Sequence, residues 1–325
     1  MHIFKNPSYD FVRWRWHAIF LSWLIIAAGV VYIQVNGMPK GVEFEGGTIV
    51  ILGFDQRPQI DQVRAALANG VPDGANAIVQ SYGGPSANQV MVRLHRSGAE
   101  SGGSLSVTAD QVTQAVKNAN LGNFRIEGTR IVGPTVGADL SRRGTLATVF
   151  ALAGILVYVT LRFQLSFAVG AVVATLHDLL ITLSVLAFFH YELSLNVIAA
   201  ILTITGYSMN DTIVIFDRIR ENMRSMRRDN LAHIVNVAVN QMLDRTLITG
   251  GTTMLSVIAL YIFGGEVLKG FAFTMIVGII TGTYSSVFIA AAIVVIWQGR
   301  RKPKTAPAAV APASAPARKS RRRAS

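Results

Sequence analysis

The sequence has 325 residues, of which 51% are apolar and only 15% are charged, and its mean hydropathy is +0.42. A soluble domain carries about 25% charged residues, so this composition predicts a membrane protein. The absence of cysteine excludes disulfides, thiol catalysis and cysteine-ligated metals. The net charge of +12 is no sign of nucleic-acid binding, because residues 300–325 hold nine of the basic residues and no acid.

Six apolar stretches are long enough, or nearly so, to cross a bilayer as helices of about 20 residues. They are residues 17–35, 145–162, 165–189, 194–217, 246–264 and 271–297. The first follows Lys5, Arg13 and Arg15, but it is longer than the apolar core of a signal peptide and no cleavage motif follows it. We therefore expect an uncleaved anchor. The fifth stretch is short and is interrupted by Gly250 and Gly251.

The charges of the short loops predict the orientation. Basic residues gather in the loop 218–245 and at both termini, whereas the loops 190–194 and 264–270 share one lysine. Because basic loops stay in the cytoplasm, we expect both termini and the 218–245 loop there. The predicted domains are the N-terminus with helix 1 (1–35), an extracytoplasmic domain (36–143), helices 2–6 (144–299) and a disordered basic tail that interacts with lipid (300–325).

The large loop 36–143 has the pattern of a small folded domain. Its predicted strands and helices alternate in the order β-α-β-β-α-β, which indicates a ferredoxin-like α+β fold. The strands are 48–54, 76–82, 89–95 and 124–132, and the helices are 58–69 and 109–119, the second opened by a capping box at Thr108. No nucleophile, metal cluster or phosphate loop is evident, so we expect a binding or coupling module. Separately, residues 230–243 predict an amphipathic helix at the cytoplasmic interface.

Two acidic residues lie inside predicted membrane helices. Asp211 lies about six residues inside the cytoplasmic end of the fourth stretch, beside Asn210, and Asp178 follows His177 near the middle of the third. An ionised side chain at mid-membrane costs at least about 2.5–3.5 kcal/mol, so it needs a partner, a proton or water. A proton or cation relay is one interpretation, with Arg245 as the alternative partner of Asp211. The other is a permanently protonated acid that only packs, and for His177–Asp178 both remain open.

Two further patterns accompany these acids. Tyr207, Ser208 and Asn210 are predicted to support Asp211 by hydrogen bonding, and Gly278 and Gly282 form a small-xxx-small pattern typical of helix packing.

Several motifs together match a known family. They are GVEFEGGT (41–48), VGPTVGADL (132–140), LHDLLITL, GYSMNDTIVIFDRIREN, RTLITGGTTM (245–254) and GGEVLKGFAFTM (264–275). With them the sequence resembles the SecF branch of the SecD/SecF family of protein-export membrane proteins, related to the RND transporters. Glu43 and Glu45 depart from the family pattern, in which an Asp and an uncharged or varied residue are commoner. The tail after residue 300 lies outside the resemblance.

The resemblance implies a multi-pass protein of the bacterial inner membrane that pairs with SecD and associates with the SecYEG channel and the translocating preprotein. It implies coupling to H⁺, or in some bacteria Na⁺, without a cofactor and without covalent chemistry. Asp211 and Arg245 match the family's functional membrane residues, and the domain 36–143 matches one thought to move. The motifs also mark a junction between that domain and the membrane, at Glu43, Gly46, Gly47, Gly133 and Pro134.

Three functions compete at this stage: an ion-coupled export subunit, a half-transporter of the RND type for small solutes, and a structural assembly subunit. Six helices are half of a usual repeat-built transporter, so the second function needs a partner half. An enzyme is not expected, because no set of nucleophile, base and orienting residue can be identified. We expect contact with lipid and no specific contact with nucleic acid.

Overall fold

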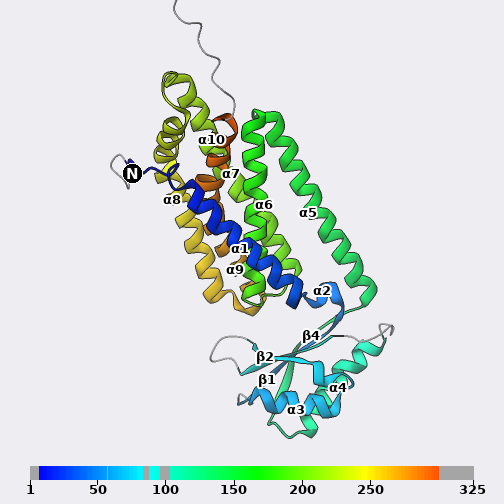
Figure 1. Cartoon of the computed structure of the whole chain (residues 1–325). Coiled ribbons are helices and arrows are strands. Elements are labelled where there is room, and N and C mark those ends of the chain that lie inside the picture. Colours follow the sequence, from blue (N-terminus) through cyan, green and yellow to red (C-terminus); the bar gives the residue numbers. More distant parts are fainter. Residues whose placement is uncertain (1–6, 57, 83–87, 96–102, 300–325) are drawn as a thin grey trace, which may run out of the picture.

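The computed structural model describes residues 7–56, 58–82, 88–95 and 103–299. Figure 1 shows a bundle of long helices with a small α+β domain at one end and the N-terminal segment at the other. The tail predicted to be disordered, most of the turn-rich linker 83–88 and most of the Ser/Gly segment 97–104 lie outside the described residues.

The bundle has six spans that are long and apolar enough to cross a membrane, as the sequence predicts. The first span is α1 (Arg15–Asn36), and the next four are α5 (Pro134–Arg162), α6 (Leu165–Phe188), α7 (Leu195–Ser225) and α8 (Leu231–Phe263). The sixth comprises α9 (Gly265–Ser285), a π-helical segment η2 (Ser286–Ala290) and α10 (Ala291–Gly299).

The fifth span differs most from its predicted form. Residues 230–243 do not make a separate interfacial helix, because α8 runs without a break from Leu231 and passes through Gly250 and Gly251. Its apolar face packs into the bundle, where Val235 and Ala238 are fully buried beside side chains of α6 and α7. Other helices of the bundle therefore cover the apolar face of residues 230–243, which was predicted to lie at the membrane interface.

The α+β domain has the ferredoxin-like order that the sequence predicts. Its elements are β1 (Gly47–Phe54), α3 (Ile60–Gly70), η1 (Gly74–Asn76), β2 (Ile78–Tyr82), β3 (Gln89–His95), α4 (Gly103–Asn118) and β4 (Phe124–Val132). The sheet has the order β2-β3-β1-β4, and all neighbouring strands are antiparallel. The capping box at Thr108 is not used as predicted, because α4 begins at Gly103 and Thr108 lies within it.

The two faces of the sheet have different neighbours. Because side chains alternate along a strand, Val50 and Leu52 of β1 point to a core formed with α3 and α4. Ile49 and Ile51 point to the opposite face, which contacts Val42 of the short segment before β1 and is turned toward the membrane bundle in Figure 1. This open face forms one wall of the cleft described below.

The structure brings the two predicted junction motifs together. A short helix α2 (Val42–Glu45) ends at Gly46, whose φ of 77° favours glycine, and Gly47 then pairs with Val132 at the end of β4. The chain passes from Val132 through Gly133 into α5, which begins with Pro134 at a position that suits proline. The domain is thus connected to the membrane by two adjacent strand ends.

The predicted small-residue pattern of the sixth span is a packing contact, as expected. A Cβ atom on Gly278 would lie 2.2 Å from Ile204, and one on Gly282 would lie 2.8 Å from the Cβ atom of Ser208. Glycine at these positions lets α9 approach α7 closely. The approach brings the polar residues of the two helices into contact.

Candidate functional site

Asp211 lies on α7, partly buried against α8. Its Oδ1 atom accepts a hydrogen bond of 2.7 Å from the hydroxyl of Thr246. Its Oδ2 atom is shielded from solvent and has no hydrogen-bond partner among the described residues. A buried acceptor without a donor is costly, so this carboxylate has capacity for a proton or a further cation.

Arg245 precedes Thr246 on α8, and its side chain is exposed. No ion pair joins it to Asp211 among the described residues, but its charge lies within electrostatic reach of that carboxylate. The sequence placed Arg245 directly before the fifth apolar stretch, 246–264, whereas it lies near the middle of α8. The structure thus places Arg245 and Asp211 on adjacent helices without direct contact.

Asp178 lies in the middle of α6 and is only 4% exposed. Its Oδ1 atom is 3.0 Å from Nδ1 of His177, and its Oδ2 atom accepts hydrogen bonds from Ser208 (2.5 Å) and Ser285 (2.8 Å). The Nε2 atom of His177 is buried and has no partner among the described residues. Ser208, which was expected to support Asp211, thus bonds to Asp178.

Adjacent serines of the sixth span connect the surroundings of the two carboxylates. Ser285 bonds to Asp178, whereas the hydroxyl of Ser286 donates to the carbonyl of Gly282 (2.9 Å) and lies 3.0 Å from the hydroxyl of Thr212, next to Asp211. The π-helical segment begins at Ser286. Such segments are frequent at functional sites.

The sequence did not identify Ser285, Ser286 or Thr246 as candidate site residues. The polar residues in TYSSVF and RTLITGG were visible signals. They are weak ones, since serine and threonine are common in membrane helices.

Asn210 does not join either carboxylate. Its side chain is exposed on α7 and makes no hydrogen bond within the described residues. Thr203 and Gly206, which lie seven and four positions earlier on the same helix face, are also exposed. The three residues form an exposed stripe of small and polar residues within a membrane-spanning helix.

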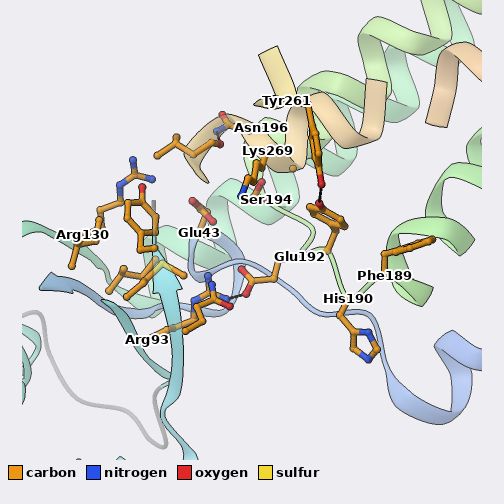
Figure 2. Close-up of a pocket in the computed structure, with 18 residues that line it drawn as sticks. Glu43, Arg93, Arg130, Phe189, His190, Glu192, Ser194, Asn196, Tyr261 and Lys269 are labelled. Atoms are coloured by element: carbon orange, nitrogen blue, oxygen red, sulfur yellow. Dashed lines mark hydrogen bonds and ion pairs between the residues drawn. The ribbon is translucent and has the colours of Figure 1, made fainter. Parts of the chain in front are cut away.

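A cleft of about 350 Å³ separates the open face of the sheet from the membrane bundle (Figure 2). Arg93 of β3 forms an ion pair across it with Glu192, which lies between α6 and α7. Arg93 is 5% exposed, and its Nε atom has no partner among the described residues. The predicted junction residue Glu43 also lines the cleft.

Backbone hydrogen bonds attach the same loop to the start of the domain. The amide of Leu193 donates to the carbonyl of Pro39 (2.7 Å), and the amide of Gly41 donates to the carbonyl of Leu193 (2.8 Å). The segment after α6 therefore contacts the domain through both Glu192 and its backbone. Because α6 carries His177 and Asp178, one helix connects the buried acid to the cleft.

Six apolar spans, a ferredoxin-like domain inserted after the first, and carboxylates inside the bundle define a multi-pass membrane protein of the transporter type. The family model described as "Protein export membrane protein SecD/SecF, C-terminal" matches residues 111–300. The chain belongs to the SecD/SecF family of protein export membrane proteins. This membership confirms the predicted family and places the chain among transport proteins, not enzymes.

Relatives named protein translocase subunit SecF match most of this chain. The protein of Escherichia coli O157:H7 is 41% identical, with 88% of this chain and 86% of the relative covered. That of Vibrio alginolyticus is 42% identical, with 89% of each covered. The crystal structure of SecDF from Thermus thermophilus, described as a translocon-associated membrane protein, matches with a TM-score of 0.79 at 31% identity. The match covers 91% of this chain and 39% of that chain.

Proposed function

We propose that this chain is the SecF-type subunit of a SecD–SecF complex, which uses the proton-motive force, or a sodium-motive force, to promote late steps of Sec-dependent preprotein translocation. Family membership supports the export role. The observation that carries the coupling is Asp211, a carboxylate in a membrane helix with one oxygen bonded to Thr246 and the other buried without a partner among the described residues.

The proposed cycle alternates the charge of Asp211. When a proton is bound, the charge between α7 and α8 is removed. When the proton leaves, the nearby guanidinium of Arg245 becomes the partner of the carboxylate. The membrane potential drives such a step with about 2.3 kcal/mol per charge per 100 mV. His177 and Asp178 provide a second acidic group on the pathway, and Asn210 lies at its exposed side. No cofactor besides the transported ion is required.

The α+β domain converts this cycle into movement. Its junction at Glu43, Gly46, Gly47, Gly133 and Pro134 connects it to α1 and α5, and the cleft contacts connect it to α6. In the proposed orientation both termini and the connection between α7 and α8 face the cytoplasm, and the domain acts on the outer side of the inner membrane. The six spans are consistent with both termini on one side.

The proposed partners are SecD, the SecYEG translocon and the preprotein. The SecDF relative is one chain, and the match to the present protein covers 39% of it. The rest of the SecDF chain serves as the model for SecD. We propose that SecD covers the exposed stripe formed by Thr203, Gly206 and Asn210. Association with SecYEG rests on the description of that relative as translocon-associated.

Preprotein translocation into inverted membrane vesicles tests the coupling. Asp211→Asn keeps the size of the side chain but cannot ionise, so we expect loss of the part of translocation that depends on the ion gradient. The matched control is Asp217→Asn, which changes an exposed acid two turns later on the same helix. Separate proton and sodium gradients identify the ion. Translocation by Asp211→Asn with undiminished dependence on both gradients contradicts the proposal.

Cysteine cross-linking tests the proposed contact with SecD. The chain has no cysteine of its own, so Asn210→Cys introduces a single thiol on the stripe. We expect a cross-link to a cysteine scanned along the membrane helices of SecD. Leu161→Cys, on the exposed outer face of α5, is the control that gives none. Equal cross-linking from both positions, or none from Asn210→Cys, counts against this surface.

A further inference from the structure

A small cavity lies between α6 and α7, beside Asp178. It is lined on α6 by Thr175, Asp178 and Thr182, and on α7 by Thr205 and Ser208, together with apolar side chains. The α6 residues recur at i, i+3 and i+7 and the α7 residues at i and i+3, so each set lies on one helix face. The space open to the centre of a water-sized sphere is about 10 Å³, which fits one water molecule or one small ion.

The protons of three lining hydroxyls are already engaged. Ser208 donates to Asp178, Thr205 donates to the carbonyl of Ile201 (2.8 Å), and Thr175 donates to the carbonyl of Ala171 (2.9 Å). Each of these hydroxyls therefore has only lone pairs left to offer the cavity. These three hydroxyls offer no proton to an anion, whereas each offers an oxygen acceptor to a cation.

Thr182 provides a second, independent observation. Its residue is 2% exposed, and its hydroxyl is buried without a hydrogen-bond partner among the described residues. Thr182 lies one turn after Asp178 on the same face of α6 and lines the cavity. Buried hydroxyls in proteins are nearly always bonded to protein, water or a bound ion, and the cavity is where such a partner of Thr182 would lie.

The local charge favours a cation as that ligand. The ion pairs of Asp178 within the described residues comprise His177 and no lysine or arginine, and no basic side chain lines the cavity. A neutral imidazole that donates from Nδ1 would not neutralise an ionised Asp178. A buried charge of this kind requires a counter-charge. Carboxylate and hydroxyl oxygens are ligands that hard cations prefer.

We propose that Asp178, Thr182, Thr205 and Ser208 form a binding site for a small monovalent cation of the size of Na⁺. The proposal deepens the suggested role of Asp178 in the ion pathway by naming its ligand, and it rests on that part of the proposed function. It does not depend on Asp211 or Arg245. The cation compensates the negative charge of Asp178 and joins α6 to α7. Of these two helices, α6 leads to the cleft and α7 carries Asp211.

Binding of ²²Na⁺ to the purified full-length protein in detergent tests the site, with choline chloride holding the ionic strength constant. We expect saturable binding that Li⁺ competes for and that K⁺ displaces at least about tenfold less well, because the cavity is small. Thr182→Val and Thr205→Val each remove one oxygen and weaken binding at least about tenfold. Thr281→Val, which removes a buried hydroxyl of α9 outside the cavity, leaves binding unchanged.

Three outcomes overturn the proposal: no saturable ²²Na⁺ binding by the unaltered protein, equal competition by K⁺, or unchanged binding in both Thr182→Val and Thr205→Val. The first shows that the cavity holds water only. Comparing Na⁺ with K⁺ on the unaltered protein needs no variant, so it remains informative if a variant fails to fold. Because no translocation is measured, failure here is distinguishable from failure of the Asp211→Asn vesicle experiment.

Discussion

The two carboxylates inside the bundle differ in the number of hydrogen bonds that their neighbours donate. Asp178 has the imidazole of His177 and two serine hydroxyls around it, whereas Asp211 has one donor, Thr246, and one oxygen without a partner among the described residues. A carboxylate with fewer fixed donors is freer to change partners. This difference is why we assign the charge-changing step to Asp211 and cation binding to Asp178.

Thr246→Val tests the contribution of the one donor to Asp211. The substitution removes the hydrogen bond to the Oδ1 atom of Asp211, and we expect the free energy of unfolding to fall by about 1–3 kcal/mol. Unfolding with SDS in mixed micelles measures the change. The control is Thr249→Val, an exposed position on α8, for which we expect a change within about 0.5 kcal/mol. Equal stability of the two variants would show that the hydrogen bond contributes nothing.

Asp10 gives a pH-dependent contact outside the membrane. The side chain of Asn236 donates to it (2.6 Å) and so does the amide of Arg13 (3.1 Å), and these bonds lower the pKa of Asp10 below its ordinary value of 3.8. The pKa is lower in the folded protein, so the stabilisation is fully present above the unfolded value and is lost as the pH falls through the folded one. We expect the contact between Asp10 and Asn236 of α8 to weaken as the pH falls below about 4.

Amide hydrogen exchange at Val12, whose amide donates to Asn236 (3.1 Å), measures this weakening. Protection at Val12 should decrease between pH 5 and about pH 3 after correction for the intrinsic exchange rate. In Asp10→Asn the decrease should be absent. A pH profile that is identical in the two proteins would assign the change to another group.

At the scale of elements, α7 and α9 hold the polar residues together. Their close approach depends on Gly278 and Gly282, which lie against Ile204 and Ser208. Ser208 and Ser285 both reach Asp178 because the helices are this close. The spacing of two glycines is thus a condition for the polar cluster, not a packing detail separate from it.

Gly282→Ala tests this dependence. The added Cβ atom would lie 2.8 Å from the Cβ atom of Ser208, so the helices must separate, and we expect a loss of about 1–3 kcal/mol in unfolding free energy. The matched control is Gly251→Ala on α8, where nothing lies within 4 Å of the added atom. That change should be neutral or stabilising by up to about 1 kcal/mol, since alanine favours a helix. A milder effect at Gly282 than at Gly251 would contradict the packing argument.

The whole molecule is organised around the cleft between the domain and the bundle. One ion pair, Arg93–Glu192, and two backbone hydrogen bonds at Leu193 join the open sheet face and the start of the domain to the loop after α6. The cleft beside these attachments has a volume of about 350 Å³. Removal of one of these attachments should change how the domain is held.

Glu192→Gln tests this attachment, because it leaves the buried guanidinium of Arg93 without its counter-charge. Removing one partner of a buried pair costs about 3–5 kcal/mol, and part of that cost is avoided if the domain moves away. Spin labels at Gln62→Cys on α3 and Thr252→Cys on α8 report the distance between domain and bundle. We expect a broader distance distribution in Glu192→Gln.

The control for this experiment is Asp139→Asn, which removes an exposed ion pair within α5. It should leave the distance distribution unchanged, because both partners belong to one helix. An unchanged distribution in Glu192→Gln would show that the backbone contacts at Leu193 suffice to hold the domain.

The sequence by itself determined the six spans, the ferredoxin-like domain and the two acids inside membrane helices. These follow from local composition: apolar length, alternation of side chains, and charge where charge is costly. The predicted start of the fifth span was wrong. The apolar face of residues 230–243 has the same sequence pattern whether lipid or protein covers it.

Only the tertiary structure decided which residues meet. It paired Asp211 with Thr246, turned Ser208 toward Asp178, left Asn210 exposed and brought Arg93 to Glu192, partners 99 positions away in the chain. Serine, threonine and a single arginine carry no signal of their partner in one sequence, since contact depends on helix rotation and on how closely backbones approach. That approach was set here by glycines, whose effect appears only when the opposing helix is in place.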